Sequence, residues 1–241
     1  KHRWYGFDDA LYAAVRLIEA VSESGRSLTE LMDAMPATSA TPEMRFPIDE
    51  ARAISKVAHE QGASVHLDGA RLFNAQAATG TPAREWAACA DTLTFCFSKG
   101  LGAPIGSMVC SSAEHIAEGR RLRKRLGGGM RQVGVIAAAA RVALETGVER
   151  LAEDHAHARR LAEALADIDP GLVDPATVET NMAYVDFAPL GRQAAEVRDE
   201  LLKEGVLTLG FPGSGMRLVT HRDVTPEGLE QAISAFRKVL A

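Results

Sequence analysis

The spacing of apolar residues near the start of the chain predicts helices. Leu11, Val15 and Ile18 recur at intervals close to the 3.6-residue period of an amphipathic helix. Ser27 is followed three residues later by Glu30, which is the sequence pattern of a capping box. A second helix is therefore predicted to begin at Ser27, and the stretch of Pro, Ser and Thr that follows it is expected to be a loop.

From Ile48 onward, the apolar pattern alternates between the periods of helices and strands. The first helix of this region has Ala51, Ile54, Val57 and Ala58 on its apolar side. In chain order, the predicted elements are helix 48–61, strand 63–67, strand 92–97, strand 105–110, helix 112–124, helix 132–145, helix 151–166, strand 182–187, helix 193–204, strand 206–209, strand 216–220 and helix 226–240.

This order of elements predicts an α/β protein with three parts. Residues 48–150 would form part of a large α/β domain. Residues 151–241 would form a smaller α+β domain, with a hinge inside or just after the helix that begins at Leu151. Residues 1–47 would form a separate helical segment.

The composition excludes several classes of protein. With 46% hydrophobic and 24% charged residues, the 241-residue chain has the balance of a globular protein. Its net charge of −5 argues against binding to nucleic acid or to an anionic membrane, because both need a basic face. No apolar run is long enough to span a bilayer. The three cysteines lack the spacing of a disulfide framework or of metal ligands, so we expect no metal site and a cytoplasmic location.

Two polar residues follow predicted strands, where ligands of α/β sheets bind. Asp68 ends one strand, and Lys99 follows another strand 31 residues later (99 − 68). A lysine amine can bond the aldehyde of pyridoxal phosphate, and a carboxylate can keep its pyridine nitrogen protonated. Taken alone, each residue is more often structural, since such aspartates commonly cap turns or helices and such lysines commonly lie in surface loops.

Six short motifs occur in the order seen in threonine aldolases. They are HLDGAR (66–71), FSKGLGAPIGS (97–107), GGGMRQ (127–132), EDH (153–155), TNM (180–182) and RLVTH (217–221). From about Ile48 to the C-terminus, the chain therefore resembles the threonine aldolases, which belong to the β-eliminating lyase group of fold-type I pyridoxal phosphate enzymes. The resemblance implies an incomplete large domain of the pyridoxal phosphate transferase type.

The resemblance also implies roles for four residues. Lys99 would bond the cofactor aldehyde as a Schiff base, and Asp68 would pair with the pyridine nitrogen. Arg71 and Arg217 would hold the cofactor and substrate end of the site, most simply by clamping the substrate carboxylate, which suits guanidinium geometry. The implied reaction is the reversible cleavage of a β-hydroxy-α-amino acid, threonine or allo-threonine, to glycine and an aldehyde. The sequence does not identify the general base.

Two further cations lie near the glycine triplet. The resemblance implies that Lys124 and Arg131 face a cofactor site across the interface of a homo-oligomer. A solvated helix end is an equally good interpretation for Lys124, because four arginines crowd the same helix.

Other polar residues have structural interpretations. His66 shares a strand face with Asp68 and could orient it, although a buried, hydrogen-bonded histidine is the commoner interpretation. We interpret Thr180 and Asn181 as turn residues and His221 as structural.

Residues 1–47 lack the features of the aldolases. Residues 3–14 and 41–43 resemble scaffold segments of bacterial phosphomannomutases and phosphoglucomutases, so the chain looks like two families joined near Pro47. The main phosphate-binding loop and the first strands of the aldolase sheet are not found in this sequence. We therefore expect an open sheet edge and weak or absent binding of pyridoxal phosphate, with loss of the aldolase activity as one expected consequence. The alternative function is that of a non-catalytic scaffold or interaction protein that retains relic motifs.

Overall fold

The computed structural model describes residues 22–27, 30, 47–209 and 212–240. The helix predicted around Leu11 and the stretches that resemble phosphohexomutases lie outside the described residues. Near the N-terminus, the Glu30 N–H donates to Ser27 Oγ at 3.2 Å, and the Ser27 N–H donates to Glu30 Oε2 at 2.7 Å. The predicted capping box is therefore confirmed.

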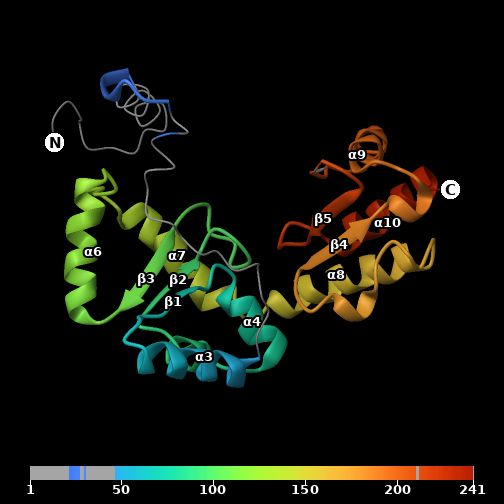
Figure 1. Ribbon diagram of the computed structural model, residues 1–241. Coiled ribbons are helices and arrows are strands. Elements are labelled where there is room, and N and C mark those ends of the chain that lie inside the picture. The colour runs from blue at the N-terminus through green and yellow to red at the C-terminus, as the bar shows by residue number, and fades with distance from the viewer. Residues whose placement is uncertain (1–21, 28–29, 31–46, 210–211, 241) are drawn as a thin grey trace.

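The first part of the described chain builds a three-stranded sheet with helices around it (Figure 1). Its strand order is β1-β2-β3, in which β1 is parallel and β3 antiparallel to β2. Within the described ranges, β1 pairs with β2 alone, so its outer edge is open, as the sequence predicts. The elements are α3 (Ile48–Glu60), β1 (His66–Asp68), α4 (Leu72–Thr79), α5 (Ala83–Ala87), β2 (Thr92–Cys96), β3 (Ser107–Ser111), α6 (Ala113–Arg125) and α7 (Gly134–Thr146).

The central strand β2 supplies the core of this first part. Leu93, Phe95 and Phe97 alternate along the strand and its continuation, and all three are buried. The Phe95 ring lies edge-on to Phe73 and Phe97, with ring centroids 5.3 Å and 5.0 Å apart. Leu151, the first residue of α8, is fully buried in the same cluster. The second part of the chain is thereby anchored to the first.

The second part packs helices on one face of a two-stranded antiparallel sheet. Ala183, Val185, Met216 and Leu218 are buried against these helices, whereas Tyr184 on the opposite face is half exposed. One sheet face thus closes a core, and the other remains available to a site. The elements are α8 (Leu151–Ala166), the 3₁₀ helix η1 (Pro175–Thr177), β4 (Met182–Asp186), η2 (Ala188–Leu190), α9 (Ala194–Lys203), β5 (Gly215–Val219) and α10 (Pro226–Leu240).

The strand predicted at 206–209 is wrong. This segment follows Gly205, whose φ is +81°, and it forms no strand in the structure. Leu207 and Leu209 are 84% and 74% exposed. In the described chain, β4 and β5 pair with each other, so these apolar residues have neither a strand partner nor a core to enter.

The predicted apolar side of α3 is also wrong. The helix buries Ser55 and half-buries Ala51 and Ala58, whereas Ile54 and Val57 are 44% and 59% exposed. The small side chains of Ala51, Ser55 and Ala58 form the inward side of α3, which packs against α5. Two larger apolar side chains therefore face outward.

The two helices α4 and α5 are missing from the prediction. The first has apolar residues on all sides, so it lacks the periodic contrast that indicates a helix, and the second has only five residues. None of the helices in the described ranges combines the length and apolar composition needed to cross a bilayer.

Replacing Ile233 by Ala tests the core of the second part. This α10 residue is 1% exposed, so Ile233→Ala is expected to lower the free energy of unfolding by about 2–5 kcal/mol. Leu202→Ala is the control, because Leu202 is 55% exposed on α9, and a change within about 0.5 kcal/mol is expected. Urea denaturation followed by circular dichroism gives both values. Equal losses in the two variants would contradict the packing described here.

Candidate active site

The parallel pairing of β1 and β2 brings two predicted site residues to the same edge of the sheet. Asp68 is the last residue of β1, and Lys99 lies three residues beyond Cys96, the last residue of β2 (99 − 96). The chain beyond β1 continues along β2, because the Cys96 N–H donates to the Ala70 carbonyl oxygen at 3.3 Å. Parallel strands present their carboxyl ends together, and ligands of α/β sheets bind at that edge.

The side chains of Asp68 and Lys99 are both exposed there. Asp68 Oδ1 accepts a hydrogen bond from the Ala70 N–H at 3.1 Å, which orients the carboxylate at the turn. Within the described ranges, the Lys99 amine has no hydrogen-bond or ion-pair partner. The amine is therefore accessible to a carbonyl ligand.

The turn that carries Lys99 is held by close backbone packing. The Gly102 N–H donates to the Lys99 carbonyl oxygen at 2.9 Å, and Gly102 has a φ of +77°, which favours glycine. A Cβ atom on Gly100 would overlap Asn74 Oδ1. The absence of a side chain at Gly100 thus lets α4 press against this turn.

Arg71 and Arg217 lie close together, although they come from the two different parts of the chain. Arg71 directly precedes α4, and Arg217 lies on β5 opposite Tyr184 of β4. Burial lowers the pKa of Arg71, and the nearby positive charge of Arg217 lowers this pKa further. Tyr184 acts on the same pKa in the opposite direction.

The Arg71 guanidinium also contains an unsatisfied donor. Its Nε atom is buried and has no hydrogen-bond partner within the described part of the chain. Native structures leave few such groups without an explanation. A buried donor beside a second cation is a suitable binding place for an anion such as a carboxylate.

A cavity of about 400 Å³ lies beside Arg217. Tyr184, Ser214, Met216 and Arg217 contribute to its lining. The cavity is large enough for a small ligand. Its lining includes Arg217, the cation whose charge lowers the pKa of Arg71.

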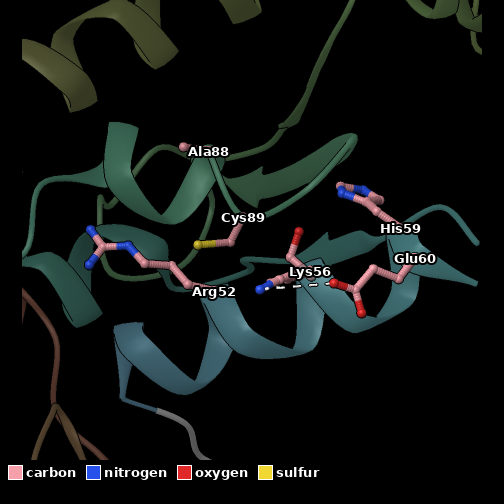
Figure 2. Close-up of a pocket in the computed structure, with 7 residues that line it drawn as sticks. Arg52, Lys56, His59, Glu60, Ala88 and Cys89 are labelled. Carbon is pink, nitrogen blue, oxygen red and sulfur yellow. Dashed lines mark ion pairs between the residues drawn. The ribbon is translucent and has the colours of Figure 1, made fainter.

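A larger cavity of about 570 Å³ lies between α3 and the end of α5, and Figure 2 shows its lining residues. Neither candidate catalytic residue lines it. Its cations already have acidic partners: Arg52 contacts Glu85 at 2.7 Å, and Lys56 lies 3.9 Å from Glu60. We therefore do not assign the candidate site to this cavity.

Lys124 and Arg131 lie apart from this cluster. Lys124 is in the last turn of α6, which packs against β3 at the opposite end of the strand order from β1 (Figure 1). Both side chains are exposed, and within the described residues no hydrogen bond or ion pair joins either of them to Asp68 or Lys99. Their role across an oligomer interface stays a prediction.

Two of the structural interpretations of polar residues are wrong in part or whole. His66 is hydrogen-bonded, because its Nδ1 lies 2.7 Å from Thr92 Oγ1, but it is exposed rather than buried. Asn181 is 2% exposed and hydrogen-bonds within the core rather than in a turn. Sequence reasoning also missed Asn74, a buried amide whose only signal is a polar residue in the apolar stretch after Arg71.

Comparison with known proteins identifies the family. Residues 38–188, more than half of the chain, match the family model for β-eliminating lyases. The chain belongs to the β-eliminating lyase family. Low-specificity L-threonine aldolase 1 of Arabidopsis thaliana is 40% identical over 188 residues, which cover 78% of this chain and 52% of that protein. Low specificity L-threonine aldolase of Escherichia coli K12 is 40% identical over 183 residues, which cover 76% and 53%.

A solved structure shows the same fold. A Listeria monocytogenes protein assigned as an L-allo-threonine aldolase superposes with a TM-score of 0.64 at 23% identity, covering 81% of this chain and 57% of that one. This similarity confirms the predicted fold class, an incomplete α/β domain of the pyridoxal phosphate enzyme type.

The family match reaches into the N-terminal segment. The chain spans little more than half the length of the curated relatives it matches. The family match begins ten residues before the predicted start at Ile48 (48 − 38). The resemblance of residues 1–47 to phosphohexomutases is supported by none of these matches and stays a prediction.

The residues of the candidate site fit pyridoxal phosphate, the cofactor that this family implies. An accessible amine at Lys99 can meet an aldehyde, and a carboxylate at Asp68 can meet a ring nitrogen. The orphaned Arg71 Nε and the neighbouring Arg217 can meet an anionic group.

Replacing Arg71 by Met tests whether this cationic pair costs stability. Arg71→Met removes a partly desolvated charge near Arg217, so the free energy of unfolding is expected to rise. Arg198→Met is the control, because Arg198 is an α9 arginine that pairs with Asp199 at 2.7 Å, and a change within about 0.5 kcal/mol is expected. Urea denaturation in a buffer without multivalent anions measures both. A clear loss of stability in Arg71→Met would contradict the account.

Proposed function

We propose that this chain carries the active site for pyridoxal phosphate-dependent cleavage of a β-hydroxy-α-amino acid, threonine or allo-threonine, to glycine and an aldehyde. The observation that carries the proposal is the position of Asp68 and Lys99 at the carboxyl ends of two paired parallel strands. The curated relatives named L-threonine aldolases support the choice of substrate.

In this proposal, Lys99 and Asp68 hold the cofactor. The Lys99 amine would bond the cofactor aldehyde, and the Asp68 carboxylate would keep the pyridine nitrogen protonated. When bound, the cofactor supplies a ring that accepts the electron pair of a breaking bond at the amino acid's Cα.

Arg71 and Arg217 would bind and orient the amino acid. Their two guanidinium groups come from different parts of the chain and are near enough for the charge of Arg217 to lower the pKa of Arg71. A carboxylate held there would fix the direction of the bond between Cα and Cβ, which is an orientation effect on the rate. The substrate loses the β-hydroxyl proton, the Cα–Cβ bond breaks to release the aldehyde, and Cα gains a proton to give glycine.

Further properties are part of the same proposal. We propose that residues 48–150 and 151–241 are the large and small domains, and that the chain acts as a homo-oligomer in which Lys124 and Arg131 contribute to the cofactor site of a partner. A reducing compartment such as the cytoplasm fits the three free cysteines. Binding of pyridoxal phosphate is expected to be weak or absent, because the main phosphate-binding loop of the aldolases is not found in this sequence.

Chemical trapping tests the proposed role of Lys99. The chain is incubated with excess pyridoxal phosphate and reduced with borohydride, which fixes the cofactor to the lysine that bonds it. Peptide mass spectrometry is expected to find the label mainly on Lys99. Glycine release from threonine, measured at saturating pyridoxal phosphate, is expected in the unaltered chain and is lost in Lys99→Ala. Lys203→Ala, which removes an exposed lysine of α9, is expected to change neither result.

Trapping also separates this function from the alternative. Even labelling of many exposed lysines, with no glycine released at any pyridoxal phosphate concentration, would contradict the proposal. That result would favour a non-catalytic scaffold that retains the motifs.

A further inference from the structure

A buried amide lies where the two parts of the chain meet. Asn74 of α4 is 2% exposed, and its Nδ2 lies 3.0 Å from His155 Nε2 on α8. The same Nδ2 donates to Oδ1 of Asn181, at the start of β4, at 3.4 Å. Asn74 thus reaches two elements of the second part from a helix of the first.

The polar partners of Asn74 are themselves tied into the second part. Asn181 Nδ2 donates to the Thr220 carbonyl oxygen at 2.7 Å, and Thr220 Oγ1 donates to the Asp154 carbonyl oxygen at 2.6 Å. Asp154 is fully buried, and its carboxylate receives two hydrogen bonds from Arg150 at 2.6 Å and 3.1 Å. A displaced Asn74 would therefore disturb a connected polar network, in which unpaired groups are costly.

The hydrogen-bonding capacity of the partners fixes the orientation of the Asn74 amide. Burial lowers the pKa of His155, so its ring is neutral near pH 7 and Nε2 can accept. Rotating the Asn74 amide by 180° would place Asn74 Oδ1 against Asn181 Oδ1, and both of these oxygens are hydrogen-bond acceptors. Oδ1 consequently points the other way, to where it leaves no room for a side chain on Gly100.

The contacts of Asn74 involve residues near Arg71, Lys99 and Arg217, which belong to three segments of the candidate site. Asn74 is three residues after Arg71, and Gly100 directly follows Lys99. Thr220, which accepts from Asn181, directly follows the strand that carries Arg217. One amide therefore connects segments that are remote in the sequence and adjacent to the candidate site.

We propose that Asn74 is a positioning residue, which fixes the turn bearing Lys99 and the strand bearing Arg217 relative to Arg71. We call its contacts with Gly100, His155 and Asn181 the Asn74 bridge. The proposal rests on the proposed function for its catalytic consequence. The bridge itself is a property of the chain without cofactor.

Hydrogen–deuterium exchange of the chain without cofactor tests the bridge directly. Asn74→Ala is expected to speed exchange at least about tenfold in residues 98–102 and also in residues 181–183. Gln76→Ala is the matched control, because it removes an amide from the same helix. Among the residues that the structure describes, the Oε1 of this amide accepts only from the Ala83 N–H, at 2.7 Å. That variant is expected to change exchange only near α5.

A second variant approaches the bridge from the opposite side. Gly100→Ala leaves the Asn74 donor in place but forces a methyl group against Oδ1. It is expected to speed exchange in residues 181–183, although the altered residue lies in the other part of the chain. If Asn74→Ala does not fold, the exchange of Gly100→Ala alone tests the Asn74 bridge. Unchanged exchange at 181–183 in both variants would overturn the bridge.

Steady-state kinetics at saturating pyridoxal phosphate test the positioning role. Asn74→Ala is expected to raise the KM for threonine about tenfold and to lower kcat about tenfold as well, because the carboxylate-binding arginines and Lys99 lose their alignment. Altered exchange with unchanged KM would overturn the positioning role. If the unaltered chain neither labels at Lys99 nor cleaves threonine, the proposed function fails, while exchange still decides the bridge.

Discussion

The parallel pairing of β1 and β2 is the constraint on which the site depends. Each strand is short, and their shared direction places the residues that follow them at one edge of the sheet. Asp68 and Lys99 are 31 residues apart in the chain (99 − 68). The parallel hydrogen-bonding of β1 and β2 nevertheless places both residues at the same edge of the sheet. An antiparallel pairing, such as that of β2 and β3, would have sent one of the two residues to the opposite edge. The direction of the two strands, rather than a contact between side chains, thus brings together the residues on which the proposed chemistry depends.

Strand direction alone does not fix the distance between the two parts of the chain. That task falls to tight packing and to a small buried polar network. Leu151 joins the aromatic core around Phe95, and Asn74 joins α4 to α8 and β4. Arg71 differs from Asn74, because its buried Nε has no hydrogen-bond partner within the described residues and its neighbour Arg217 is also a cation. An unpaired buried donor near a second cation is typical of a site prepared for an anionic ligand.

Periodicity and motif order predicted most of the fold, and the failures have physical causes. The helix Leu151–Ala166 and the helix Pro226–Leu240 have the predicted bounds, because each shows a clear apolar side. The helix α4 has none, and Leu207 and Leu209 suggest a strand that has nothing to pair with. For the site, the motifs predicted Asp68, Lys99, Arg71 and Arg217 as candidates. They could not reveal Asn74, since its importance depends on what reaches it from 81 residues away along the chain.

The most direct test of the account is a crystal structure of the chain after pyridoxal phosphate has been fixed by borohydride. We predict a ring attached to Lys99 Nζ, with its nitrogen facing the Asp68 carboxylate. A ring attached to Lys99 whose nitrogen points away from Asp68, or one attached to a lysine elsewhere, would contradict it.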